Sequence, residues 1–560
     1  MKGFDYRVLG MSLMLLLPSA AAVAQDEEGK GFTFSGSLQT DILFPEEDEA
    51  IGTGSYTDDC LSNTYLDLNL RSKYVDAGAR LEYMRAPMPG FEGGFRGQGL
   101  PHIYITGKYK GVELTAGDFY EQFGSGLVLR TYEERSLGVD NSIRGGRLKF
   151  SPYKGIRVRM LGGNQRYYWE RSDGYVYGAD VELSIDQWSK RMQDNMWFLT
   201  LGGSYVGKFE KADDDRIFPE PGNLNTILNL PETVNSFDVR ANLQKGNYSF
   251  LAEYAMKSYD PSAENGYIYK KGTALLLSGS YSKRGMSLLL QAKRSDDMQY
   301  RSQRGVTGTA LTINNLPAFA YQHTYALAAL YPYATQPDGE WAYQGEFRYN
   351  FKRGTALGGK YGTDIRINFS HVRSIERDPR LNPWGQTMGS DGYSSKFFKQ
   401  GDLYYQDLHI DISKKFNKSF KGNLMYMWQK YNQEVVEGHA ENGNPVNSHI
   451  FVADGKYTIN RRLTLRMELQ YLHTKQDEGD WGYALAELTV LPYLMFTVSD
   501  MYNFGATNQH YYMGMVTFNH GAHRLAVSYG RTRAGYNCSG GVCRYVPASK
   551  GFQISYNLVF

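Results

Sequence analysis

The feature that most constrains the fold is a two-residue alternation of apolar and polar side chains, which recurs along the chain. In one segment Leu66, Leu68 and Leu70 alternate with Asp67 and Asn69. The same pattern returns in residues 237–243, 346–351, 407–413 and 463–471. A period of two is typical of β-strands with one apolar and one polar face. These segments are about ten residues long, which is the length a tilted strand needs to cross a bilayer.

The connections between these segments alternate between short and long. Short links with turn-forming residues lie at 110–111, 153–155, 245–246, 283–285, 417–418, 460–461 and 520–521, and long polar links lie near 209–231, 296–318, 373–402, 433–446 and 534–549. A soluble sandwich has no reason for this asymmetry, whereas outer-membrane barrels have short periplasmic turns and long extracellular loops. The pattern predicts an all-β fold: one large transmembrane antiparallel β-barrel of roughly 22–26 strands. Between residues 319 and 372 the pattern leaves open which connection lies at which end.

The N-terminus has the layout of a secretory signal peptide. Lys2 and Arg7 precede an apolar stretch, and small residues then lead up to Ala24. We expect residues 1–24 to be a signal peptide and residues 25–560 to form the barrel, located in a bacterial outer membrane. Strand-like alternation begins at Phe32, almost directly after the expected cleavage site, so no separate plug domain is predicted.

The C-terminus ends on an aromatic residue of a final alternating segment. Apolar side chains share one face of this segment at Phe552, Ile554, Tyr556, Leu558 and Phe560. This arrangement resembles the terminal strand by which outer-membrane barrels are recognised for insertion. The resemblance implies two partners, the outer-membrane lipid and the barrel-insertion machinery. The alternative is the last strand of a secreted sandwich.

Cysteine and charge usage narrow the remaining possibilities. Cys538 and Cys543 are close enough in sequence to close a small loop by a disulfide in an oxidising compartment, which leaves Cys60 as a free thiol. The net charge of +2 predicts no strong electrostatic partner, and we do not expect a nucleic-acid ligand.

The stretch from Gly117 to Gly146 is richer in charge and glycine than a lipid-facing strand should be. Its candidate network residues are Asp118, Glu121, Arg130, Glu133, Glu134, Arg135, Asp140 and Arg144. If the stretch folds into the lumen, these charges must pair, because unpaired charges away from water are costly. A solvated extracellular loop is the competing interpretation, and the sequence favours neither.

Part of this stretch carries a family resemblance. The runs Gly117–Gly126, Tyr132–Arg135 and Arg144–Gly146, with His323–Tyr325 and Gly358–Gly362, resemble the signature of an uncharacterised outer-membrane β-barrel family of Bacteroidota. The resemblance extends over most of the mature chain. It implies a porin-like membrane barrel and brings no known activity, cofactor or catalytic residue with it.

Little in the sequence suggests chemistry. Ser448 and His449 are neighbours on a strand, so they point to opposite faces and cannot form a catalytic dyad. His409 shares a face with Asp407 and Asp411, which we interpret as a luminal polar ladder rather than a metal site. We therefore expect no enzyme activity, no metal and no cofactor.

Acidic loop residues at Asp213–Asp215, Asp378 and Asp391 could bind calcium, although their spacing fits no EF-hand pattern. Solvated loops are the simpler interpretation, and whether calcium binds is left open.

Two functions from different classes remain. The first is a porin-like passive channel for polar solutes, suggested by polar faces that carry both signs of charge. The second is a structural or accessory barrel subunit of a multi-protein outer-membrane complex, with an envelope protein as its partner.

Overall fold

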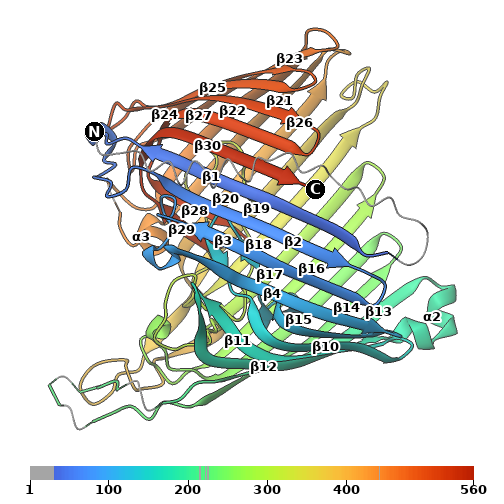
Figure 1. Ribbon diagram of the computed structural model, residues 1–560, viewed down its shortest axis with the longest axis vertical. Coiled ribbons are helices and arrows are strands. Elements are labelled where there is room, and N and C mark those ends of the chain that lie inside the picture. Colours follow the sequence, from blue (N-terminus) through green and yellow to red (C-terminus); the bar gives the residue numbers. More distant parts are fainter. Residues whose placement is uncertain (1–30, 213–215, 221, 224–225, 441, 541) are drawn as a thin grey trace.

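The computed structural model describes residues 31–560, except residues 213–215, 221, 224–225, 441 and 541. Its main element is one sheet of 24 antiparallel strands that closes into a barrel (Figure 1). The all-β prediction and the predicted range of strand numbers are both confirmed. The predicted signal peptide and Asp213–Asp215 lie outside the described residues.

The wall strands follow one another around the barrel in chain order. The first half comprises β1 (Thr33–Pro45), β2 (Leu61–Arg71), β3 (Val75–Met84), β4 (Gly97–Tyr109), β5 (Val112–Phe119), β10 (Ile143–Tyr153), β11 (Ile156–Tyr167), β12 (Glu170–Ser184), β13 (Trp197–Phe209), β14 (Thr233–Lys245), β15 (Tyr248–Tyr259) and β16 (Lys271–Lys283). The second half comprises β17 (Met286–Asp296), β18 (Gly339–Phe351), β19 (Thr363–Pro379), β20 (Tyr393–Lys415), β21 (Phe420–Tyr431), β22 (Val446–Thr458), β23 (Leu463–Thr474), β24 (Trp481–Val490), β25 (Leu494–Asn503), β26 (His510–His520), β27 (His523–Thr532) and β30 (Ser549–Val559).

Shorter elements occupy the connections. They are the strands β6 (Gln122–Phe123), β7 (Leu129–Arg130), β8 (Glu133–Glu134), β9 (Val139–Asp140), β28 (Gly535–Ser539) and β29 (Val542–Val546), the helices α2 (Lys190–Asp194) and α3 (Gln433–Glu437), and four 3-10 turns at Glu49–Ile51, Gly93–Phe95, Ile185–Trp188 and Ala263–Asn265. No helix among the described residues is long and apolar enough to cross a membrane.

The barrel closes where the first and last wall strands meet. β1 pairs with β2 on one side and with β30 on the other, with Leu38 opposite Leu558. Gly36 and Phe560 exchange backbone hydrogen bonds of 2.7 and 2.9 Å at this seam. Closure leaves no unpaired edge in this sheet. An unpaired edge would be unstable in lipid, because its backbone groups would have no hydrogen-bond partners.

The two ends of the barrel differ as the sequence predicts. Every predicted short link lies at the end where α2 is found, and the long connections lie at the opposite end, with α3 and the β28–β29 hairpin (Figure 1). The undecided region is resolved, because residues 297–338 connect strands at the long-loop end and residues 352–362 at the short-turn end. The predicted loop 373–402 is wrong in extent: β19 and β20 continue as a paired ribbon, and only residues 380–392 join them.

The apolar face of the wall points outward and the polar face inward. On β14, Phe237 and Val239 are 47% and 63% exposed, whereas Asp238 between them is 3% exposed. Arg240 of the same strand pairs inward with Asp180 of β12 at 2.5 Å. This orientation, with the polar side turned toward an enclosed interior, is the one expected of a transmembrane barrel.

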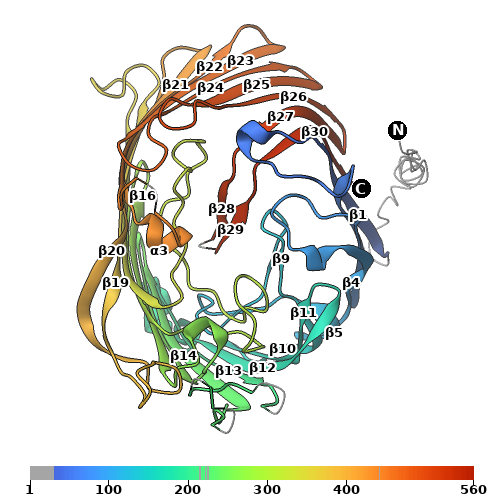
Figure 2. The same ribbon diagram turned by 90° about the vertical axis from the view of Figure 1, so that its left-hand side faces the viewer.

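The interior is not empty. Residues 120–142 and 297–338 leave the wall and run inside the ring of strands, as Figure 2 shows from the long-loop end. Buried apolar side chains of both segments, among them Phe123, Leu127, Ile313 and Leu327, form one cluster with luminal apolar residues of the wall. The core of this molecule therefore lies inside the barrel.

Candidate functional site

The lumen holds the features from which a function can be argued, and the first is a network of buried charges. Arg80 of β3 is 6% exposed and contacts four carboxylates, one of which is Glu82 on its own strand at 3.6 Å. Its guanidinium lies 2.7 Å from Asp67 on the neighbouring strand, 2.8 Å from Glu133 and 3.3 Å from Asp140 of the internal segment. The wall thereby holds segment 120–142 inside the barrel through ion pairs.

Two further arginines complete this network. Arg135 bridges Glu133 at 2.7 Å and Asp67 at 2.8 Å, and Arg166 of β11 contacts Asp140 at 2.7 Å. Arg166 also pairs with buried Glu82 of β3 at 2.6 Å. Removing one partner of such a pair leaves an uncompensated buried charge, so each residue of the network holds the others in place.

The other candidate residues of the charged stretch lie in separate places. Asp118 pairs with Arg144 at 2.7 Å, and Glu121 pairs with Lys149 at 2.7 Å. The Arg130 guanidinium lies over the Tyr132 ring, and Glu134 accepts a hydrogen bond from Ser136, so neither belongs to the network around Arg80. The structure thus places the stretch in the lumen and not in a solvated extracellular loop.

Hydrogen bonds join the two internal segments to each other. The Arg130 N–H donates to the carbonyl of Ile313 at 2.8 Å, and the Asn315 N–H donates to the carbonyl of Gly126 at 3.0 Å. The buried Asn314 amide donates to the carbonyls of Leu127 and Met298 at 2.9 and 2.8 Å. The segments therefore form one interior body.

A fully buried ion pair fixes the far end of segment 297–338. Lys293 of β17 lies 2.7 Å from Glu340 of β18, and both side chains are shielded from solvent. Lys293 also donates to the Pro317 carbonyl at 2.6 Å, and the Tyr333 hydroxyl donates to Glu340.

A polar cavity of about 630 Å³ opens in the lumen beside the short-turn end of the barrel. Six basic side chains line it, Lys283, Arg348, Arg366, Lys421, Lys456 and Arg466, against three acidic ones, Asp364, Asp411 and Asp454. Lys421, Lys456 and Arg466 occupy directly opposed positions on β21, β22 and β23. Like charges opposite one another destabilise a sheet. Sequence reasoning missed this row, because its members meet only when strands pair in register.

The remaining candidate residues lie away from the interior network. Cys538 and Cys543 are joined by a disulfide bond across the β28–β29 hairpin, and Cys60 is a free, partly buried thiol. Asp391 pairs with Arg380 at 3.1 Å in the β19–β20 connection. Ser448 is fully buried on the luminal side, and His449 contacts Tyr426.

Known structures with a similar arrangement are other β-barrels. The translocation pore of the P pilus usher PapC matches with a TM-score of 0.43 and 11% identity, covering 94% of this chain and 99% of that one. The siderophore receptor PirA from Pseudomonas aeruginosa has a TM-score of 0.40 and 8% identity, with 94% and 80% covered. OccK11 (OpdR) from the same organism has a TM-score of 0.34 and 9% identity, with 94% and 96% covered.

Sequence comparison gives a family but no activity. No curated protein sequence matches the chain. A model described as a family of unknown function, DUF6029, matches residues 7–560.

Proposed function

Starting from a chain that belongs to the DUF6029 family of unknown function, we propose that it is an outer-membrane channel for small polar solutes, with a preference for anions. The observation that carries this proposal is the cationic cavity inside a closed barrel whose outer face is apolar.

The outer surface supports the membrane location. Phe250, Leu290, Phe451, Met467 and Val498 are each 50% or more exposed on wall strands. An apolar band of this kind around a barrel is stable when acyl chains cover it. In the usual orientation of such barrels, with the short turns in the periplasm, the cationic cavity would open on the periplasmic side.

The interior supports a narrow channel rather than a wide one. A barrel of this strand number encloses a broad lumen unless segments fold into it, and segments 120–142 and 297–338 do so. They restrict the path to small solutes, and the row of Lys421, Lys456 and Arg466 attracts anions at the periplasmic mouth.

Conductance in planar bilayers tests the channel. We expect the purified, folded barrel to give discrete small steps and a reversal potential in a salt gradient that indicates anion preference. A folded barrel that conducts at no voltage contradicts the proposal.

One observation favours the second function, an accessory barrel in an envelope complex. The buried cluster that includes Tyr300, Ile313, Leu327 and Tyr331 fills luminal space with apolar side chains, which a solute pathway does not need. Affinity isolation from native membranes separates the two functions. A stoichiometric envelope partner together with absent conductance would establish the accessory role.

A further inference from the structure

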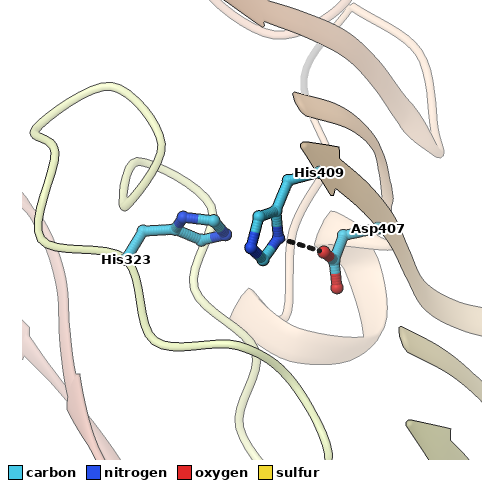
Figure 3. Close-up of side chains that lie close together, drawn as sticks. All are labelled: His323, Asp407 and His409. Atoms are coloured by element: carbon cyan, nitrogen blue, oxygen red, sulfur yellow. Dashed lines mark hydrogen bonds and ion pairs between the residues drawn. The ribbon is translucent and has the colours of Figure 1, made fainter. Parts of the chain in front are cut away.

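Two histidines from distant parts of the chain meet inside the barrel. His409 lies on the luminal face of β20, and His323 lies in segment 297–338. Their ring centroids are 4.7 Å apart, and Figure 3 shows the two rings with a nitrogen of each directed toward the other. We propose that His323 and His409, with an adjacent carboxylate, bind a late first-row divalent cation such as Zn²⁺.

The spacing of the donor atoms fits one ion. His323 and His409 can each present a ring nitrogen so that the two atoms lie within 4.8 Å of each other, and a carboxylate oxygen of Asp407 lies within the same distance of both. Ligand atoms around a tetrahedral Zn²⁺, bound at roughly 2.0–2.1 Å, are about 3.3 Å apart. Small side-chain rotations are enough to reach that spacing.

The ligand nitrogens are buried and unsatisfied. His409 is fully buried, and neither its Nε2 nor Nε2 of His323 has a hydrogen-bond partner among the described residues. A buried polar atom without a partner destabilises the fold, because it has lost its hydrogen bonds to water. A cation between the two nitrogens removes this destabilisation at both atoms.

The neighbouring carboxylates have separate tasks. Asp407 lies 3.2 Å from Nδ1 of His409, so it accepts the Nδ1 proton and leaves Nε2 free to bind metal. The Asp411 carboxylate lies 3.8 Å from Nε2 of His409 and can provide an oxygen ligand. Asp411 also lies 3.8 Å from Arg366, whose guanidinium hydrogen-bonds the Tyr321 hydroxyl. Arg366 keeps the Tyr321 hydroxyl as a partner when Asp411 turns toward the ion.

The site has a route from solvent and a structural consequence. His323, Asp411 and Tyr321 line the cationic cavity, so an ion can reach the site from the short-turn end. Binding would join segment 297–338 to the wall strand β20. A cation that binds only the folded state stabilises it by mass action, and here it would hold the internal segment in place.

Metal binding to the full folded barrel in detergent tests the proposal. After EDTA treatment and removal of the chelator, equilibrium dialysis against Zn²⁺ should give one bound ion per chain, and Co²⁺ should give visible absorption typical of tetrahedral coordination. His323→Ala should weaken Zn²⁺ binding by at least roughly tenfold, and Asp407→Asn by about tenfold through loss of the oriented imidazole.

A matched variant separates this site from surface binding. His510 pairs with Asp500 at 2.6 Å on the exposed part of β26, so His510→Ala removes a histidine–carboxylate pair and should leave Zn²⁺ binding unchanged. Circular dichroism establishes that each variant keeps its sheet. Zn²⁺ binding that is absent in the wild type, or equal in the wild type and His323→Ala, overturns the proposal. Conductance is recorded separately, so the channel and the metal site can fail independently.

Discussion

Arg80 is the residue on which the interior charge network depends most, because its guanidinium contacts Asp67, Glu133 and Asp140 at the same time. Arg80→Met keeps the apolar stem and removes the charge. Arg135 and Arg166 still pair with these carboxylates, so we expect a loss of about 3 kcal/mol in the free energy of unfolding, the lower end of the range for a broken buried pair. Urea unfolding in lipid vesicles measures this loss.

A surface pair provides the control. Arg96 is paired with Asp58 at 2.5 Å, but its side chain is 54% exposed. Arg96→Met should cost less than about 1 kcal/mol, because exposed pairs contribute little. Equal losses at both positions would show that the interior network does not stabilise the barrel.

Asp297 should make stability depend on pH. It lies just beyond β17, where burial raises the pKa of its carboxyl to about 7, although Lys257 lowers the pKa and Asn265 donates a hydrogen bond to the carboxyl. Asp260 and Asp296 nearby raise the pKa further. The unfolded carboxyl has a pKa of about 3.9. Because the folded pKa is the higher one, the contribution of Asp297 to stability is greatest at low pH and falls as pH rises from about 4 to about 7.

The measurement is the thermal midpoint of the folded barrel in detergent between pH 5 and pH 8.5. The wild type should lose stability across this interval, and Asp297→Asn should lose less, because the amide does not titrate. Identical pH profiles for the two proteins would rule out Asp297 as the cause.

At the residue scale, the sequence indicates which residues carry the interior charges better than it indicates which of them make contact. Glu133, Arg135 and Asp140 could be selected from the density of charge in one stretch, and they do meet in the lumen. Their partners Arg80 and Arg166 could not be selected from the sequence. A period of two shows which face of a strand a residue occupies, but it does not show which residues face it across the lumen.

At the scale of elements, the strands and short turns were predictable and the internal segments were not. Turns such as Lys110–Gly111 follow from local chemistry, since Gly111 adopts a positive φ of 81° that favours glycine. Segment 297–338 has no regular period, because its apolar residues pack against luminal side chains from many strands. The β19–β20 ribbon was missed because residues 373–379 and 393–402 do not alternate apolar and polar side chains.

The joint between the internal segments is the element most open to test. Asn314→Leu removes the amide that binds the carbonyls of Leu127 and Met298. Leaving these buried carbonyls unpaired costs about 1–3 kcal/mol, so we expect segment 297–338 to open more often while the wall stays intact. Limited proteolysis should cut this segment faster than in the wild type, with unchanged circular dichroism. Asn519→Leu, at an exposed position of β26, is the control and should leave the cleavage rate unchanged.

At the scale of the whole molecule, the pairing of strands into the barrel wall brings together charges that no local sequence pattern connects. β21, β22 and β23 are sequential strands, and their pairing aligns Lys421, Lys456 and Arg466 in one row at the cavity wall. Within this row Arg466 pairs with Asp454 at 3.1 Å and also with Glu468, whereas Lys421 and Lys456 form no ion pair among the described residues. Such a row costs stability, and the proposed binding of an anion in the cavity would offset that cost.

The ion preference of the channel should follow this row. Lys421→Glu with Lys456→Glu replaces two positive charges by two negative ones, so the reversal potential in a salt gradient should change from anion toward cation preference, because the charge lining a narrow path selects the permeating ion. Lys360→Glu makes the same kind of change at the short-turn end, beside Tyr361 and outside the cavity lining. It should leave the reversal potential close to that of the wild type. If the double variant keeps the anion preference, the solute path does not pass Lys421 and Lys456, and the conducting route must run along another part of the lumen.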